Sequence, residues 1–363
     1  MIRIEHLSKR FGNLVVLKDI TTEIKMGEVV SIIGASGTGK STLLRCLNLL
    51  EYPSGGTIHI NGVNILDKKA DVAQLRQKMS MVFQSLNLFS HLSVLENLTI
   101  GPIKLKGMGK EAAQLKAMEL LRRVGLAEKA ISLPDEITCG QQQRVAIARC
   151  MAMDPQIILL DEPTSALNPT SVSEVLSVIR RLANEGMTMV IVTQEMDFAR
   201  EVSNRVLYLD EGIIYEEGTP KQIFDNPQKE KTRAFIQRIY SYTCRISSPD
   251  YDLYAMNAEI ETFVEKQLLP KKTRDSLLLL VEELLQVYTP YLPSIVLDLT
   301  ITYWEKSERL EVVCESSGEE ANPFDSDNLS DYDLGLTIIK NLTENIDYQW
   351  FNGKNRLQLL IKK

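Results

Sequence analysis

The sequence predicts an α/β fold with a parallel core sheet, followed by a second, smaller α+β domain. Three short apolar runs, Val29–Ile33, Ile157–Leu160 and Met189–Thr193, have the length and composition of strands that are buried on both faces. Segments with helical spacing of apolar residues separate them, and strands that alternate with helices are typical of a parallel sheet. After about residue 250 a new pattern of helices and strands begins. Two domains are therefore expected.

The length and composition fit a soluble protein of two domains. The chain has 363 residues, of which 44% are hydrophobic and 25% charged, and these are ordinary values for a globular protein. No stretch is long and apolar enough to span a membrane, and Met1–Glu5 lacks the start of a signal peptide, so a cytoplasmic protein is expected. The cysteines lack metal-type spacing, which favours reduced thiols at Cys46, Cys139, Cys150, Cys244 and Cys314.

The net charge of −7 is unevenly distributed along the chain. Residues 243–363 carry 12 Lys and Arg against 21 Asp and Glu, a net charge of −9, so the remainder carries +2. This step in charge favours two separately built units. A mildly acidic chain without a basic stripe is a poor candidate for nucleic-acid binding, so no nucleic-acid partner is expected.

The first domain is expected over residues 1–242. Residues 2–33 have the pattern of strands with turns, and a helix is predicted over Ser41–Leu50. A second hairpin-like stretch follows near Pro53–Ile60. Residues 92–152 have Leu, Ala and charged residues at helical spacing, which predicts a helical segment between the buried strands.

The second domain is expected over residues 250–363. Ala234–Tyr240 is predicted to end the first domain, and Ser241–Pro249 is predicted to be a linker. A compact α+β domain would then follow, with a polar acidic loop from Glu315 to Asp333. Its predicted helices are Ile260–Leu268, Leu277–Tyr288 and Leu336–Thr343, and its predicted strands are Ser294–Tyr303, Leu310–Cys314 and Arg356–Ile361.

A phosphate-binding loop is the most specific motif in the chain. Gly34–Ser41 fits the pattern G-x-x-x-x-G-K-[ST] between a buried strand and a predicted helix. Glycines let backbone N–H groups curl around phosphates, and the helix N-terminus adds partial positive charge. Lys40 would pair with the β and γ phosphates of ATP, and Ser41 would offer a hydroxyl to Mg²⁺. The expected nucleotide-binding residues are Gly34, Ala35, Ser36, Gly37, Thr38, Gly39, Lys40, Ser41 and Thr42.

Two carboxylates follow the apolar run Ile157–Leu160. Asp161 would hold the Mg²⁺ shell, and Glu162 would orient or deprotonate the attacking water. Acidic residues at the end of a strand can also be a solvated edge. The phosphate loop upstream makes the catalytic interpretation the better one.

Several further segments match one protein family. Gln84 ends a Val-Phe-Gln segment, Gly140–Arg144 has the sequence Gly-Gln-Gln-Gln-Arg, and Ser165–Leu167 follows the two carboxylates. Together with the phosphate loop, they make residues 1–242 similar to the ATP-binding subunits of the ABC transporter superfamily. The closing segment 223–235 resembles that of polar amino-acid importers.

This resemblance implies a P-loop NTPase of ABC type, with a parallel core sheet, an antiparallel β subdomain and a helical subdomain. It also implies that two such subunits, identical or different, close around MgATP and drive separate permease subunits. Phe11 would stack on adenine, and Gln84 would sense Mg²⁺ and contact the permease. Thr138, Gly140 and Gln141 would belong to a signature stretch that caps the γ-phosphate held by the opposite subunit. The implied Mg²⁺ set is Ser41, Gln84 and Asp161.

Three positions depart from the family pattern. Cys139 replaces a glycine of the signature, and its side chain would crowd the approach of the backbone to phosphate. Gln194 replaces the switch histidine, so this position cannot carry a proton near neutral pH. Asn168 replaces the aspartate of the D-loop. Glu162, Gln194 and Gln84 are the expected catalytic set, and hydrolysis is predicted to be slow or nearly absent.

Residues 250–363 resemble the anti-sigma-factor type of histidine-kinase-like ATPase domain. The similar segments are Val281–Leu285, Asn322–Asp325, Leu334–Lys340, Ile346–Tyr348 and Asn352–Leu357. The family's Mg²⁺-binding asparagine is replaced by Val287, or by Gln286 if Glu282 is the matching glutamate, and its adenine-reading aspartate by Ser316. Acidic residues and no Lys or Arg lie between Glu311 and Asp333, which would repel a triphosphate. A pseudo-ATPase that binds a regulatory protein is therefore expected.

Two functions fit these motifs. The first is the ATP-binding subunit of an amino-acid importer, peripheral on the inner face of the cell membrane. The second is a non-transport, ATP-dependent regulatory switch that acts through the C-terminal domain, which slow hydrolysis would suit. An exporter subunit fits less well, because segment 223–235 resembles importers.

Overall fold

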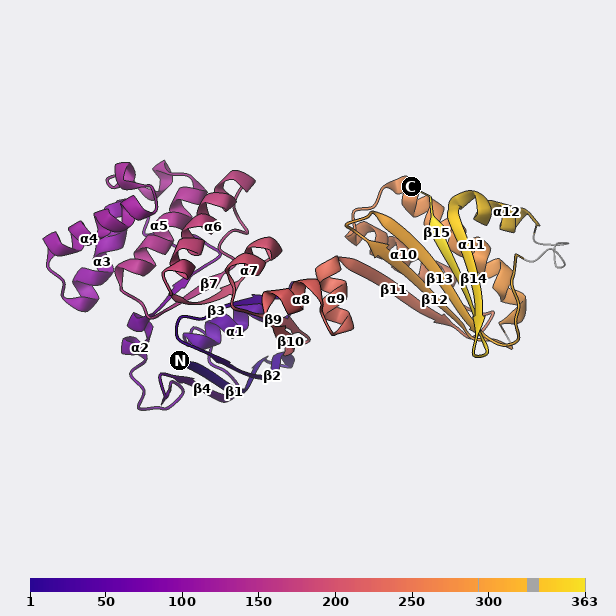
Figure 1. Ribbon diagram of the computed structural model, residues 1–363, viewed down its shortest axis with the longest axis horizontal. Coiled ribbons are helices and arrows are strands. Elements are labelled where there is room, and N and C mark those ends of the chain that lie inside the picture. Colours follow the sequence, from indigo (N-terminus) through magenta and orange to yellow (C-terminus); the bar gives the residue numbers. More distant parts are fainter. Residues whose placement is uncertain (293, 325–332, 363) are drawn as a thin grey trace. The chain divides into compact units, whose positions relative to one another are not determined.

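The computed structural model describes residues 1–292, 294–324 and 333–362, which form two compact units (Figure 1). The first unit is Met1–Arg233 and the second is Ala234–Lys363. The boundary falls inside helix α9 (Glu230–Gln237).

The first unit is built on a ten-stranded sheet in the order β5-β4-β1-β2-β10-β9-β3-β8-β7-β6. Strands β9, β3, β8, β7 and β6 pair in parallel, whereas β5, β4, β1 and β2 pair antiparallel. The strands are β1 (Ile2–Phe11), β2 (Leu14–Ile24), β3 (Val29–Ile33), β4 (Gly55–Ile60), β5 (Val63–Asn64), β6 (Met79–Val82), β7 (Ile157–Asp161), β8 (Thr188–Val192), β9 (Arg205–Asp210) and β10 (Ile213–Gly218). The predicted parallel core and antiparallel β subdomain are both present.

The central parallel strands are buried on both faces, as their continuous apolar sequences predict. Every residue of β3, β7 and β8 is buried. Because successive side chains of a strand point to opposite faces, each strand contributes to two cores. In β7, Ile158 and Leu160 belong to one hydrophobic cluster, and Ile157 and Leu159 belong to the other.

The predicted helical segment forms a group of helices that pack on one another. Helices α3, α4 and α5 contact each other, and Asn97 of α3 is fully buried with its amide donating to the carbonyls of Phe89, Leu92 and Ser93. The helices are α1 (Lys40–Leu47), α2 (Val72–Lys78), α3 (Val94–Lys106), α4 (Lys110–Arg123), α5 (Cys139–Ala152), α6 (Pro169–Asn184), α7 (Met196–Val202) and α8 (Pro220–Asp225), with short 3-10 turns η1 (Ala127–Lys129) and η2 (Pro134–Glu136).

The second unit is an antiparallel sheet with helices packed on one face (Figure 1). The strand order is β11-β12-β13-β15-β14. In β12, residues alternate between buried and half-buried, which leaves one face for the helices. The strands are β11 (Ile239–Ile246), β12 (Leu297–Trp304), β13 (Arg309–Ser317), β14 (Thr343–Phe351) and β15 (Lys354–Ile361), and the helices are α10 (Leu253–Lys266), α11 (Lys271–Tyr288), η3 (Thr289–Tyr291) and α12 (Asp333–Leu342).

The expected linker at Ser241–Pro249 is wrong over most of its length. Strand β11 occupies Ile239–Ile246 and pairs residue by residue with β12. Ile246 is 3% exposed and packs in the core of the second unit. The second unit therefore starts before residue 242, because its edge strand β11 begins at Ile239. The sequence of this strand alternates Tyr and Cys with polar residues, and this composition also fits a polar linker.

In the described parts of the chain, none of the helices has the length and apolar character needed to cross a membrane. Asp325, the last residue of the motif Asn322–Asp325, lies outside the described residues, as do residues 326–332 of the acidic loop predicted over Glu315–Asp333. The first three residues of that predicted loop are instead the end of β13.

The pairing of β11 predicts where the second unit can be cut. A fragment of residues 234–363 should fold cooperatively, whereas a fragment of residues 250–363 should not, because it lacks β11. Loss of the buried Ile246 side chain alone costs about 1.5–3 kcal/mol, against a typical stability of about 5–15 kcal/mol for a domain. Thermal unfolding followed by circular dichroism compares the two fragments. Equal stability would contradict this boundary.

Candidate functional site

The segment between β3 and α1 has a backbone that only glycine adopts easily. Gly34, Gly37 and Gly39 have φ angles of 149°, 81° and 98°. A Cβ atom on Gly34 would lie 2.2 Å from the carbonyl oxygen of Leu209 in β9. Conformation therefore favours glycine at all three positions, and space also requires it at Gly34 and Gly39, where a Cβ would lie 2.2 Å and 2.7 Å from its nearest neighbours. Together the three glycines form a loop that leads to the start of α1.

Lys40, the first residue of α1, lies inside this loop. Its side chain is largely buried, and its ammonium donates a hydrogen bond of 2.6 Å to the carbonyl of Ala35. The hydroxyl of Thr38 donates to the same carbonyl at 2.9 Å. Burial lowers the pKa of the Lys40 ammonium, while the carboxylates of Glu162 and Asp161 act in the opposite direction. The loop thus holds one cation close to two acids.

Ser41 and Asp161, which are 120 residues apart in sequence, are in direct contact. The Ser41 hydroxyl donates a 2.6 Å hydrogen bond to Oδ1 of Asp161, and the Arg45 guanidinium lies 3.7 Å from Oδ2. Asp161 is 2% exposed. Burial raises the pKa of its carboxyl, and the Ser41 hydrogen bond and Arg45 counteract this rise. A hydroxyl and a carboxylate predicted as Mg²⁺ ligands therefore lie side by side.

Glu162 is held next to Gln194. Its backbone has a φ of +43°, and its N–H donates to the carbonyl of Val192 at 2.9 Å. The side-chain amide of Gln194 donates a 3.1 Å hydrogen bond to Oε1 of Glu162. Gln194, which stands where the resemblance implies a switch histidine, thus contacts Glu162, the carboxylate that is expected to act on water.

These residues border one cleft of about 880 Å³. It brings together the predicted Lys40, Ser41, Gln84, Glu162 and Gln194. Gln84 comes from the segment after β6. The other predicted residues on its wall are Ser36, Gly37, Gly39 and Thr42, and the remaining lining residues are Val16, Thr164, Ser165, Leu167, Pro169, Val172 and Glu195.

Several predicted residues do not line this cleft. Gly34, Ala35 and Thr38 of the loop are absent from its wall, and so is Asp161, which contacts Ser41 from β7. Phe11, at the end of β1, is 44% exposed, and the Lys9 ammonium lies 4.5 Å from the centre of its ring. The signature residues Thr138, Gly140 and Gln141 are at the start of α5 and are absent from the lining. The fold of one chain therefore leaves the signature stretch apart from the phosphate loop.

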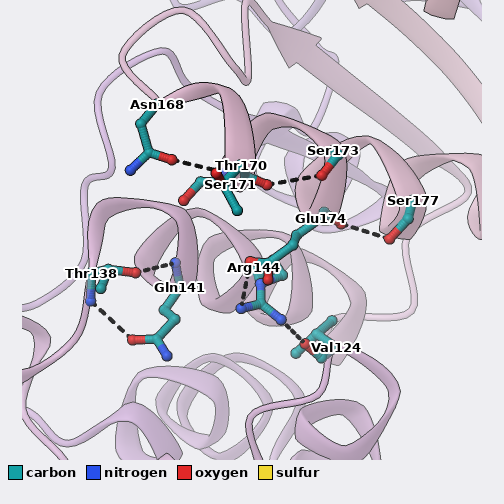
Figure 2. A network of polar contacts seen from close by, with 10 residues as sticks. All are labelled: Val124, Thr138, Gln141, Arg144, Asn168, Thr170, Ser171, Ser173, Glu174 and Ser177. Carbon is teal, nitrogen blue, oxygen red and sulfur yellow. Dashed lines mark hydrogen bonds and ion pairs between the residues drawn. The ribbon is translucent and has the colours of Figure 1, made fainter.

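Figure 2 shows that the signature stretch is an N-capped helix end. The Thr138 hydroxyl accepts a hydrogen bond from the N–H of Gln141 at 3.3 Å, and the side-chain oxygen of Gln141 accepts from the N–H of Thr138 at 3.0 Å. This reciprocal pair is a capping box, which fixes where a helix begins. Two of the three predicted signature residues thus have a structural role within the chain.

Helix α5 is held against α6 by close packing and an ion pair (Figure 2). A Cβ on Gly140 would lie 2.5 Å from Cβ of Ser171, so this glycine is required for the contact. Arg144 lies 3.1 Å from the carboxylate of Glu174 and donates to the carbonyl of Val124 at 2.8 Å. Cys139, in contrast, is exposed, so packing within the chain tolerates a side chain where the family has its first glycine.

Asn168 retains a structural role despite the loss of the family's aspartate. Its side-chain oxygen accepts a hydrogen bond from the N–H of Ser171 at 2.9 Å and caps α6. An asparagine caps a helix about as well as an aspartate does. The substitution therefore changes charge and leaves the local fold intact.

Sequence reasoning missed one residue that links α5 to the cleft. Gln143 is 1% exposed, and its amide donates at 3.3 Å to the carbonyl of Phe83, the residue before Gln84. The spacing of Gln143 from Gly140 and Ile147 could have indicated its burial, because residues three and four apart lie on the same face of a helix. Its polar character concealed its position on the buried face.

The arrangement fits a magnesium nucleotide. The glycine conformations keep side chains out of the loop, and Lys40 supplies a positive charge there. The Ser41 hydroxyl and the Asp161 carboxylate are oxygen ligands of the kind that Mg²⁺ prefers. Glu162 is a carboxylate at the edge of the same cleft, where it can act on a water molecule.

Comparison with known proteins agrees with this site. The family model described as "ABC transporter" matches residues 17–165. The chain is 53% identical over 239 residues to the arginine transport ATP-binding protein ArtM of Bacillus subtilis, a match that covers 66% of this chain and 100% of ArtM. It is 49% identical over 239 residues to the glutamate/aspartate import ATP-binding protein GltL of Escherichia coli, with 66% and 99% of the two chains covered.

A solved structure shows the same fold. The dimeric ATP-binding cassette MJ0796, in a post-hydrolysis state bound to ADP and Pi, has a TM-score of 0.56 and 35% sequence identity. The match covers 61% of this chain and 99% of that chain. The predicted ABC-type P-loop NTPase fold is therefore confirmed. This chain belongs to the ABC transporter family, as one of its ATP-binding ATPase subunits.

Proposed function

We propose that this chain hydrolyses MgATP in the cleft around Lys40 to drive import of a polar amino acid through separate permease subunits. The observation that carries the ATPase part is the contact of Ser41 with Asp161 at the base of the phosphate loop. The amino-acid part is supported by relatives named for arginine transport and for glutamate/aspartate import. The expected location is peripheral, at the inner face of the cell membrane.

Each residue of the cleft has a proposed task. Lys40 and the N–H groups of the loop bind the phosphates, and Ser41 with Asp161 holds Mg²⁺, with Gln84 nearby. Bound Mg²⁺ would neutralise phosphate charge. Glu162 orients the attacking water or accepts its proton, and the amide of Gln194 keeps the Glu162 carboxylate in place.

A second cassette subunit would complete the site. Thr138, Gly140 and Gln141 do not line the cleft of their own chain. In the closed dimer they would cap the γ-phosphate held by the opposite subunit, with the N-terminus of α5 adding its partial positive charge. ATP-dependent closure of two subunits would then drive the permease.

A permease is expected to dock in a groove on the first unit. This groove of about 650 Å³ is mainly apolar and includes Phe89 and Leu105, which are 45% and 60% exposed. Phe83 lines the groove, and its neighbour Gln84 lines the nucleotide cleft. A permease segment in this groove would therefore contact Phe83, the residue next to Gln84 of the nucleotide cleft. This adjacency would couple nucleotide binding to the permease over a short distance.

Turnover is proposed to be slow. Gln194 offers an amide that is already bonded to Glu162, and it cannot exchange a proton near neutral pH. Cys139 is exposed at the start of α5, where it would crowd the phosphate of an opposite subunit. Asn168 lacks the charge of an aspartate.

The second unit is proposed to be a histidine-kinase-like pseudo-ATPase that binds a regulatory protein. A five-stranded antiparallel sheet with α10, α11 and α12 on one face is compatible with this fold. Val287 is apolar and stands where the family has its Mg²⁺-binding asparagine. Ser316 is uncharged and stands where the family has the aspartate that binds adenine. This module would adjust the activity of the cassette.

Lys40→Ala should weaken MgATP binding, because it removes the cation buried in the phosphate loop. Equilibrium dialysis with a fluorescent ATP analogue measures the effect, and at least a tenfold rise in Kd is expected, equivalent to about 1.4 kcal/mol. Lys18→Ala, a change on neighbouring strand β2, is the control and should leave Kd unchanged. Unchanged affinity of the Lys40→Ala variant would refute the proposed function.

Gln194→His should raise steady-state ATP turnover, and Gln194→Ala should lower it. Histidine restores a polar group that can exchange a proton, and such positioned groups contribute on the order of 10²–10³ in rate. Alanine removes the hydrogen bond that holds Glu162. Phosphate release at saturating MgATP is the measurement. Equal turnover in all three proteins would exclude Gln194 from catalysis.

Leu105→Asp should weaken binding of a permease without changing MgATP affinity. The change places a charge in the apolar groove and lies outside the nucleotide cleft. Purification of tagged full-length chain from detergent-solubilised membranes, followed by mass spectrometry, measures the captured permease. Thr57→Asp on β4, away from both cavities, is the control. If the unchanged chain captured no membrane protein, the alternative of a non-transport switch would be favoured.

A further inference from the structure

The second unit contains a cavity that the ATPase activity does not use. Its volume is about 430 Å³, and it lies between the end of α11, the start of α12, β13 and the segment after β13. Its walls are mainly apolar and include Val287, Ile295, Pro323 and Leu336. Cavities of this size, with apolar walls and a few polar groups, are typical of small-molecule sites.

Two residues with hydroxyl groups, Tyr288 and Ser316, belong to the wall of this cavity. Each residue is 6% exposed. Within residues 1–292, 294–324 and 333–362, neither hydroxyl forms a hydrogen bond, and neither oxygen is fully buried, so both remain open to the cavity. A hydroxyl that opens into a mainly apolar cavity can orient a ligand by a hydrogen bond. Burial raises the pKa of Tyr288, so its hydroxyl remains a neutral donor at physiological pH.

The other buried polar side chain of the wall is already satisfied. The amide of Asn355 donates to the carbonyl of Glu319 at 2.9 Å. Its oxygen accepts from the N–H of Ala321 at 2.9 Å and from the hydroxyl of Tyr348 at 2.5 Å. Asn355 therefore shapes the cavity, and Tyr288 and Ser316 are left to bond a ligand.

The charges around the cavity disfavour an anion. Among the described residues that line it, Glu319 carries the only formal charge, and it is negative. A Cβ on Gly335, in the first turn of α12, would lie 2.7 Å from the carboxylate of Glu283. A carboxylate thus already lies against the helix end that could otherwise attract a phosphate. The nucleotide cleft differs, because Lys40 is part of its wall.

We propose that this cavity binds a small, uncharged and mainly apolar ring compound, which hydrogen-bonds to the hydroxyls of Tyr288 and Ser316. The apolar walls supply most of the binding free energy. The two hydroxyls select a ligand with a polar group at one end. Nucleoside triphosphates and other anions are excluded. The second unit is therefore a small-molecule-binding unit.

The experiment uses 4-fluorophenol as an uncharged ring probe and 4-fluorobenzoate as its anionic counterpart. The full-length chain carries Trp304→Phe, so Trp350 is the one tryptophan that remains. The indole N–H of Trp350 donates at 3.4 Å to the carbonyl of Gly318, a residue of the cavity wall, so its fluorescence reports on the cavity. A saturating amount of a non-hydrolysable ATP analogue with Mg²⁺ keeps the first cleft filled.

Binding of 4-fluorophenol should be saturable, with a Kd of about 1 mM or lower by both Trp350 fluorescence and ligand ¹⁹F NMR. The Kd of 4-fluorobenzoate should be at least about tenfold higher, because its charge would lie near Glu319. Tyr288→Phe and Ser316→Ala should each raise the Kd of 4-fluorophenol about three- to tenfold. Tyr291→Phe is the matched control, since Tyr291 lines the cavity but is 55% exposed, and it should change Kd less than about twofold.

Three results would overturn the proposal. They are the absence of saturable 4-fluorophenol binding, equal affinity for the two probes, and equal effects of Tyr288→Phe and Tyr291→Phe. Nucleotide stoichiometry gives an independent check by equilibrium dialysis of the unmodified chain. One MgATP per chain is expected, and two would mean that the second unit binds nucleotide. These readouts do not depend on ATP turnover or on a permease.

Discussion

The parallel register of β3, β8 and β7 is the constraint on which the nucleotide site depends. Ile32 pairs with Val192, and Val192 pairs with Asp161, so the carboxyl ends of the three strands lie at one edge of the sheet. Burial on both faces fixes this register, because a shift by one residue would move every apolar side chain to the opposite core. The phosphate loop, Asp161 with Glu162, and Gln194 each follow one of these strands.

The short distances in the site follow from that alignment. Ser41 reaches Asp161 because α1 begins just beyond β3, next to the end of β7. Gln194 reaches Glu162 because both residues lie just beyond paired strands. The burial that aligns the strands also desolvates Asp161 and Lys40, which raises one pKa and lowers the other. The same packing that stabilises the sheet therefore sets the electrostatics of the cleft.

The helical part of the first unit places the predicted signature residues Thr138, Gly140 and Gln141 outside the cleft of its own chain. Gly140 and Arg144 hold α5 against α6, and the Thr138 capping box fixes where α5 starts. Gln143 joins the same helix to the segment before Gln84. The backbone just before Gln84 is therefore tied to α5 by a hydrogen bond. The second unit has its own core and its own cavity. Among the described residues that line this cavity, the only formal charge is the negative one of Glu319, which disfavours phosphate.

The sequence alone determined the class of the first unit and most of its site. Continuous apolar runs predict strands buried on both faces, and the spacing of Gly34, Lys40 and Ser41 predicts a loop for phosphate, because both patterns are local. Tertiary structure decided the contacts between distant residues, including Ser41 with Asp161 and Gln194 with Glu162. It also decided that β11 belongs to the second unit, because an edge strand is recognised only by its partner. The cavity beside Tyr288 could not be predicted, because its walls come from segments that only folding brings together.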